Sequence, residues 1–171
     1  MDATSRQVRL PLPITPRGGA IGTVVDLSAT GLPPEETLLI AFANLQSYQL
    51  MQQVTTDKDG SFATTQEVPR WAELNGAHYF FASRSDERPL AFSHPFHVTP
   101  TSGVARVSGT IGSTVDGCVD LKTPGDVLYH LTGDAGTRVA GERVTVTGRV
   151  ADAAVCGGAG VVIDVAEIEV R

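Results

Sequence analysis

The chain contains few residues whose types and spacing could do chemistry. His94 and His97 place two imidazoles three residues apart, and on a helix they would share one face. Pro95 lies between them and the surrounding residues favour a strand, in which successive side chains point to opposite faces. Positions 94 and 97 then point in opposite directions, so we expect two ordinary surface histidines.

Metal-binding patterns are incomplete in this sequence. The segment Asp57-Lys58-Asp59-Gly60 begins like a calcium loop, but such loops need oxygen ligands at further set positions and a late bidentate Glu. Ser61 and the residues after it do not continue that series, so Asp59 is interpreted as a turn residue. A zinc site is not expected either, because Cys118 and Cys156 lack the Cys-x-x-Cys spacing that builds a tetrahedral site.

No catalytic constellation is visible. The sequence has no Gly-x-Ser-x-Gly elbow, no phosphate loop and no Cys/His nucleophile pattern. A glycosidase would need two carboxylates that face each other across a cleft, and nothing pairs the scattered carboxylates of the C-terminal half. We therefore predict a non-enzymatic protein with no catalytic, cofactor-binding or metal-binding residues and no cofactor. The carboxylates in question are Asp116, Asp120, Asp126, Asp134 and Glu142.

Three side chains are candidates for a ligand-binding face. Tyr129 and His130 are neighbours on a predicted strand, so one should face the interior and the other the solvent. A barrel that binds a ligand on its face would use this strand. Trp71 is the only tryptophan; stacking on a carbohydrate is one role for it, and packing against the core is the favoured interpretation.

The charge balance bears on the choice of partner. Thirteen Lys and Arg against nineteen Asp and Glu give a net charge of −6. This argues against a general nucleic-acid binder, because phosphate contacts need a basic surface. The exception would be a local patch, since Arg143 and Arg149 are six apart on one predicted strand and share a face, with Arg138 nearby. We expect no nucleic-acid partner.

The chain shows neither a membrane span nor a signal peptide. No apolar run approaches the roughly 20 residues that cross a bilayer, and residues 1–9 are polar, without the apolar segment of a secretion signal. Either the protein is cytosolic or its leader has been removed. Residues 1–17, with three prolines, are expected to form an extended or disordered leader segment.

Strands must position the candidate side chains in both halves of the chain. Turn signals separate the apolar runs of residues 18–99, above all Asp59-Gly60, where Gly accepts a positive φ. A helix over residues 35–51 is the alternative by propensity, but the prolines before it favour strands. Short strands at this spacing predict a sandwich. The expected strands are 21–27, 37–43, 48–56, 61–66, 78–82 and 91–98.

The C-terminal half, residues 104–171, predicts a small barrel. Its apolar stretches include two with a clean period of two, and five strands of this size can close on themselves and remove their exposed edges. Small polar residues with Pro and Gly at 100–103 predict a linker between two domains. The expected barrel strands are 104–111, 119–121, 127–131, 143–150 and 161–170.

Each half resembles a known kind of domain. The N-terminal half resembles the immunoglobulin-like modules of bacterial surface and secreted proteins, through Gly31-Leu32-Pro33-Pro34, the 56–62 hairpin, Val68-Pro69, and the runs 79–82 and 96–98. The C-terminal half resembles an OB barrel, through residues 131–134 and 140–148, and is similar to uncharacterised bacterial barrel domains in which two cysteines bracket this strand. The resemblances imply an all-β chain: an immunoglobulin-like β-sandwich followed by a small five-stranded OB-like barrel.

The two cysteines bear on location and function. Cys118 and Cys156 lie at strand edges, and we expect a disulfide between the first and last hairpins of the barrel, with two buried thiols as the alternative. A disulfide favours a periplasmic or secreted protein. We expect a non-enzymatic binding or assembly module of the bacterial cell envelope with a protein or oligosaccharide partner. The alternative is an oligosaccharide-binding protein that uses the barrel face.

Overall fold

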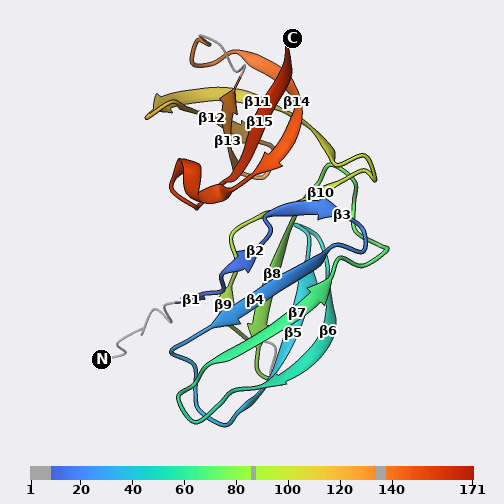
Figure 1. Cartoon of the computed structure of the whole chain (residues 1–171), viewed down its shortest axis with the longest axis vertical. Helices are drawn as coiled ribbons and strands as arrows, with labels where there is room; N and C mark the ends of the chain where they lie inside the picture. Colours follow the sequence, from blue (N-terminus) through green and yellow to red (C-terminus); the bar gives the residue numbers. More distant parts are fainter. Residues whose placement is uncertain (1–8, 86–87, 134–137) are drawn as a thin grey trace, which may run out of the picture.

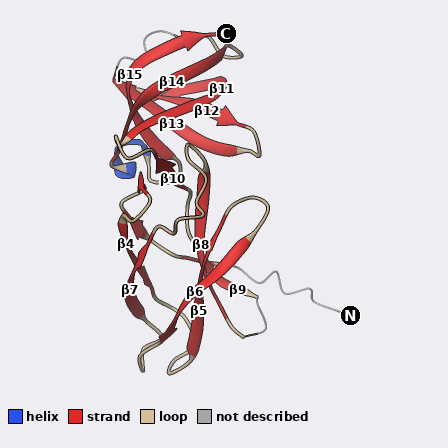
Figure 2. Ribbon diagram, turned by 90° about the vertical axis from the view of Figure 1, so that its right-hand side faces the viewer, coloured by secondary structure: helices blue, strands red, loops and turns tan. Residues whose placement is uncertain are grey.

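The structure is a computed structural model that describes residues 9–85, 88–133 and 138–171. It is an all-β chain in which a sandwich is followed by a small closed barrel. The barrel is stacked on one end of the sandwich, as both views of the molecule show (Figures 1 and 2). Within the described ranges, the single helical element is a short 3₁₀ turn, Ala153–Cys156, between the last two barrel strands.

The sandwich consists of two sheets of unequal size. The smaller sheet has the order β2 (Ile14–Thr15), β4 (Val24–Ala29), β7 (Phe62–Glu67). The larger sheet runs through β1 (Leu10–Pro11), β9 (Pro89–Phe92), β8 (Ala77–Ser83), β10 (Phe96–Thr99) and β3 (Gly18–Ala20), and β5 (Thr37–Ala43) and β6 (Tyr48–Thr55) extend it from the other edge of β8.

Alternating apolar side chains build the core between these sheets. Along β4 every other residue is buried, so Val25, Leu27 and Ala29 face inward as a period of two requires. They meet the fully buried rings of Phe42, Phe80 and Phe96 from the larger sheet. Residues 35–51 contribute the antiparallel strands β5 and β6, which confirms the strand interpretation over the helical alternative.

One expected strand is in fact two. Residues 91–98 were expected to be continuous, but β9 ends at Phe92 and β10 begins at Phe96. Between them the Ser93 N–H donates to the Phe80 carbonyl, and the Phe80 N–H donates to Ser93 Oγ, both at 2.9 Å. Both short strands therefore lie along the same edge of β8. The expectation of two surface histidines is wrong: His94 is exposed, whereas His97 is fully buried, because a barrel side chain covers it.

The structure also describes part of the segment 1–17, which was expected to be an extended or disordered leader. Residues 1–8 of the expected leader lie outside the described residues. From residue 9 on, the segment is extended and belongs to the sandwich, because β1 pairs with β9 and β2 pairs with β4. Leu12 and Ile14 are buried in the sandwich core. Apolar residues between the prolines thus extend the sandwich.

The barrel closes through five strands, as expected, and their order is β11-β12-β13-β15-β14. All neighbouring pairs are antiparallel except β13 and β15, which are parallel. Its interior is filled by aliphatic side chains, among them Leu121, Leu131, Val146 and Ile163. The strands are β11 (Val104–Val115), β12 (Cys118–Thr123), β13 (Val127–Gly133), β14 (Arg143–Ala151) and β15 (Val161–Val170).

Residues 100–103 connect the sandwich to the barrel. They form a tight turn in which the Gly103 N–H donates to the Pro100 carbonyl at 2.9 Å, and Gly103 has a φ of 77°. The last sandwich strand ends at Thr99 and the first barrel strand begins at Val104. That the chain divides into two domains at this turn stays a prediction.

A disulfide joins Cys118 to Cys156, with the two Cα atoms 6.0 Å apart. Cys118 begins β12, next to the β11–β12 hairpin, and Cys156 ends the 3₁₀ turn between β14 and β15. The bond therefore ties the first hairpin of the barrel to the last one, which confirms the expected pairing.

Removal of this disulfide should destabilise the protein. The bond closes a loop with a sequence separation of 38, and the chain-entropy model assigns roughly 4 kcal/mol to a loop of that length. We expect Cys118→Ser with Cys156→Ser to lower the free energy of unfolding by about that amount in urea titrations. Thiol labelling of denatured, non-reduced protein should find no free thiol, and two labelled cysteines in oxidised material would contradict the pairing.

Asp59 lies in the turn at residues 57–61, as interpreted from the sequence, and a neighbouring carboxylate caps this turn. The carboxylate of Asp57, rather than that of Asp59, accepts from the N–H groups of Asp59 and Ser61, at 2.9 and 3.0 Å. Gly60 has a φ of 77°, and a Cβ there would collide with the Leu32 carbonyl oxygen. The turn thus docks against the neighbouring loop, and Gly60 is needed both for its conformation and for space.

The two requirements at Gly60 can be separated by a matched pair of variants. Gly22 has a φ of 90°, and no described atom beyond its chain neighbours would lie within 4 Å of a Cβ added there. Gly22→Ala therefore carries the backbone cost alone, of order 1 kcal/mol. Gly60→Ala adds the collision with Leu32, and we expect it to cost at least about 2 kcal/mol more. Thermal or urea unfolding of both variants measures the difference; equal costs would mean that the contact with Leu32 is unimportant.

Candidate functional site

The barrel is attached to the sandwich by polar contacts at several points. His97 of β10 is hydrogen-bonded to the Tyr129 hydroxyl of β13, with 2.7 Å between Nδ1 and the hydroxyl oxygen. The Arg106 N–H of β11 donates to the Asn75 side-chain oxygen at 2.9 Å. The Arg17 guanidinium donates to the Gly158 and Ala159 carbonyls at 2.6 and 3.0 Å. Together these contacts set the position of one unit on the other.

The pair formed by His97 and Tyr129 is buried between the two units. Their exposed fractions are 0% and 2%, so each polar atom needs a partner. His97 Nε2 lies 3.4 Å from the Asn75 oxygen, which can only accept, so this nitrogen carries the proton. Nδ1 of the neutral ring then accepts from the Tyr129 hydroxyl. Burial raises the pKa of Tyr129, which keeps this hydroxyl protonated as a donor.

Another buried histidine shapes the loop that faces the barrel. His78 Nε2 accepts from the Glu73 N–H at 3.1 Å, and Nδ1 lies 3.1 Å from the Gly76 carbonyl, to which it donates. Its ring stacks on Phe42, with the centroids 4.9 Å apart. Burial lowers the pKa of His78, consistent with a neutral structural residue. The imidazole thereby holds the 73–76 loop, from which Asn75 reaches the barrel.

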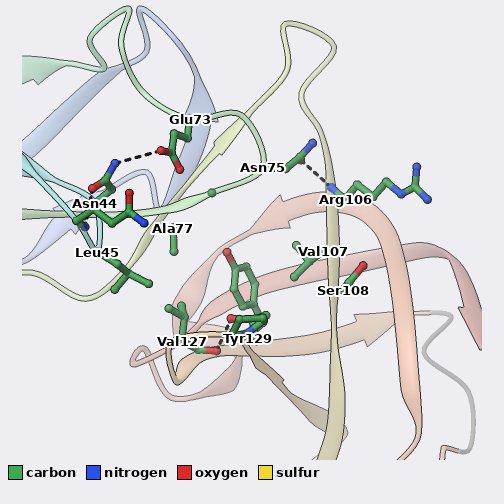
Figure 3. A pocket seen from close by; sticks show the side chains of 14 residues that line it. Asn44, Leu45, Glu73, Asn75, Ala77, Arg106, Val107, Ser108, Val127 and Tyr129 are labelled. Atoms are coloured by element: carbon green, nitrogen blue, oxygen red, sulfur yellow. Dashed lines mark hydrogen bonds between the residues drawn. The ribbon is translucent and has the colours of Figure 1, made fainter. Parts of the chain in front are cut away.

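A cleft opens where this loop and the β5–β6 hairpin face the barrel. Its volume is about 440 Å³, and Figure 3 shows Tyr129 rising from the barrel between Val127 and Val107, with Ala77 of the sandwich above it. Both units contribute to its walls. The lining residues are Asn44, Leu45, Gln46, Glu73, Asn75, Gly76, Ala77, Arg106, Val107, Ser108, Thr123, Pro124, Val127 and Tyr129. We call this space the junction cleft.

The sandwich wall of the junction cleft carries amides and a carboxylate. Asn44 Oδ1 accepts from the N–H groups of Gln46 and Ser47, both at 2.8 Å, so the hairpin turn fixes this side chain. Its Nδ2 donates to Glu73 Oε1 at 3.4 Å. The barrel wall includes Ser108 and Thr123, whose hydroxyls are hydrogen-bonded to the Thr145 hydroxyl and the Val127 carbonyl. This combination of donors and acceptors suits a polar ligand with hydroxyl or amide groups.

The structure does not bring the three expected ligand residues together. Tyr129 lies in the junction cleft, but its hydroxyl is engaged by His97. His130 follows Tyr129 on β13 and is buried rather than facing solvent, and its Nδ1 lies 2.9 Å from a carboxylate oxygen of Asp120. Trp71 packs edge-on against Phe42, with the ring centroids 5.4 Å apart. Its ring therefore packs against the sandwich core, which was the favoured interpretation.

Sequence reasoning missed the residues that build the junction. Asn75 was not singled out, although it precedes Gly76 and such a pair signals a turn; it has a φ of 57°, which Asn tolerates better than most residues. Arg106 takes part through its backbone N–H, which no side-chain pattern reveals. His97 was found but placed on the surface.

Neither a metal-binding cluster among the described residues nor a match to a known protein indicates what binds in the junction cleft. In the described ranges, no group of three or more His, Cys, Asp or Glu side chains could hold a metal ion. No helix in the same ranges is long and apolar enough to cross a membrane. No protein-family model matches the chain, and no curated protein matches it. The junction cleft is therefore judged on its own geometry.

Burial of His97 should make stability depend on pH. Burial, reinforced by the neighbouring His78, lowers the pKa of His97 to about 4, against about 6.5 in an unfolded chain. Between these values the unfolded state binds more protons, so stability is full above about pH 6.5 and falls as the pH drops towards 4. The total loss from His97 is roughly 3 kcal/mol.

Urea unfolding at several pH values measures this effect. His97→Gln should be less stable than the wild type at neutral pH, because Tyr129 loses its partner, but its stability should fall less between pH 6.5 and 4. His94→Gln, at an exposed position, should keep most of the wild-type slope. Identical slopes for His97→Gln and the wild type would show that this ring titrates normally.

Proposed function

We propose that this chain is a non-enzymatic binding or assembly module of the bacterial cell envelope, and that its partner binds in the junction cleft. The observation that carries the proposal is the cleft itself: about 440 Å³, with polar side chains from both units. Each unit supplies only part of this set of groups. A ligand in this cleft would contact the sandwich and the barrel at the same time, so binding would require both units.

The lining is held in place before any ligand arrives. The Asn44 amide is fixed by its hairpin, the 73–76 loop is held by His78, and Asn75 is bonded to the barrel backbone. A site whose side chains are already ordered loses less conformational entropy on binding. This preorganisation supports a binding role for the junction cleft.

An oligosaccharide is the other candidate partner, and its site differs from the one expected. Exposed aromatics on the second and third barrel strands would favour a sugar there, yet Tyr129 and His130 are both buried. The amides of Asn44 and Gln46 and the carboxylate of Glu73 can instead bind sugar hydroxyls in the junction cleft. Their presence favours an oligosaccharide bound in the cleft over one on the barrel face.

The disulfide supports the location. Disulfides persist in oxidising compartments and are rare in the cytosol, and Cys118 and Cys156 form one. A periplasmic or secreted protein fits this chemistry. The resemblance of the N-terminal half to modules of bacterial surface proteins points the same way.

A bulky side chain at the rim of the junction cleft tests the proposal. Gln46 is exposed and lines the cleft, so Gln46→Trp should block it. Gln49 is exposed on β6 and is not a lining residue, so Gln49→Trp is the matched control. We expect the oxidised wild type and the control to retain the same components of an array of bacterial envelope glycans and proteins, and Gln46→Trp to lose them. Equal retention by all three proteins would show that the cleft is not the site.

A further inference from the structure

A row of cations crosses the outer face of the barrel beside the junction cleft. Thr110 of β11 is paired with Lys122 of β12 on one side and with Arg143 of β14 on the other. Residues directly opposite each other in a sheet project from the same face. Arg171 continues the row, because its N–H donates to the Arg143 carbonyl at 2.8 Å. Three cations thus follow one another over about 14 Å, at about 4.8 Å per strand.

These cations line a groove that continues from the cleft. A hollow of about 500 Å³ lies along Ser108, Thr110, Lys122, Thr123, Arg143 and Arg171, among others. Ser108, Thr123 and Pro124 line both this hollow and the junction cleft. We call this hollow the cationic groove. A linear ligand that enters the cleft therefore meets the row of cations next.

Hydroxyl groups support the row and fix one of its members. Thr145 is paired with Ser108, and their hydroxyl oxygens are 2.8 Å apart. The Arg171 Nε donates to the Thr145 hydroxyl at 2.8 Å. Arg171 is thereby held over the groove by a neutral hydroxyl, and its nearest carboxylate neighbour in the sheet is Glu169, opposite Thr145.

Nearby carboxylates do not neutralise the row. Within the described residues, none approaches Lys122, Arg143 or Arg171 within ion-pair distance. Asp120 faces His130, Glu142 faces Arg138 at 3.9 Å, and Glu169 occupies the next row, opposite Thr145. In a chain of net charge −6, the row is a local patch of positive charge that an anion can approach.

We propose that the cationic groove binds a linear anionic polysaccharide, whose carboxylate or sulfate groups contact Lys122, Arg143 and Arg171. This inference rests on the proposed binding function and names the class of ligand. Guanidinium groups form charge-assisted, bidentate hydrogen bonds with such oxyanions. The neutral amides and hydroxyls of the junction cleft bind the hydroxyls of the same chain.

A nucleic acid fits the groove less well. Binding of single strands depends on aromatic side chains on which bases stack, and none of the described residues that line the cationic groove is aromatic. Tyr129 in the adjoining cleft is buried and engaged by His97. Arg149 does not extend the row of cations. It is opposite Val104, at the other end of β14 from Arg143. Arg138 is paired with Glu142.

Fluorescence anisotropy with labelled polygalacturonate fragments tests this proposal on the oxidised full chain. We expect the wild type to bind them and Lys122→Gln with Arg143→Gln to bind at least about tenfold more weakly, because two charge-assisted contacts are lost. Lys58→Gln with Arg70→Gln removes the same charge from exposed sandwich positions and should bind like the wild type. Salt should weaken wild-type binding more steeply than that of the groove variant.

The outcomes separate this inference from the proposed function. The inference is supported if the groove variant loses polygalacturonate binding while the control variant keeps it. This holds for either result with Gln46→Trp. If neutral dextran binds as tightly as polygalacturonate and Gln46→Trp abolishes both, the cleft is a binding site and the anionic class is wrong. No binding of polygalacturonate by the wild type, or equal losses in the groove and control variants, would overturn the inference. So would tighter binding of a single-stranded oligonucleotide through Lys122 and Arg143.

Discussion

The buried hydrogen bond between His97 and Tyr129 is the constraint on which the arrangement of the two units depends. Each side chain brings a polar atom into the space between two hydrophobic cores. A buried donor or acceptor left without a partner costs about 1–3 kcal/mol. An apolar contact alone tolerates sliding and rotation, but this bond is satisfied at one relative position. The junction therefore fixes the relative position of the sandwich and the barrel in addition to holding them together.

The same position creates the junction cleft. With His97 against Tyr129, the Asn75 oxygen accepts a hydrogen bond from the Arg106 N–H, which ties the 73–76 loop to the barrel. Glycines allow the close approach elsewhere along the junction. A Cβ on Gly18 would lie 2.6 Å from Val150 Cγ2, and one on Gly125 would lie 2.5 Å from Leu45 Cδ1. The cleft is the space that remains between surfaces already held together at their buried centre.

Features set by local pattern could be predicted from the sequence, and features set by partners from distant segments could not. The alternation in β14 and the turn residues before it were enough for a barrel strand, and strand-edge cysteines were enough for the disulfide. His97 was misplaced because the face of β10 opposite the sandwich core is covered by the barrel, through Tyr129. Leu12 was missed because its burial depends on strands far along the chain. Of the site, Tyr129 and His97 were both singled out, but their pairing was not predicted.

Net charge is an average, whereas recognition depends on which side chains are neighbours in space. Lys122, Arg143 and Arg171 are well separated along the chain, and acidic residues lie close to each of them in the sequence. Only the closure of the barrel puts β12, β11 and β14 side by side. The register then aligns the cations with Thr110, while the carboxylates Asp120 and Glu169 fall in other rows. An acidic chain can therefore present a local anion-binding surface, and its overall charge argues against a polyanion only where no such row forms.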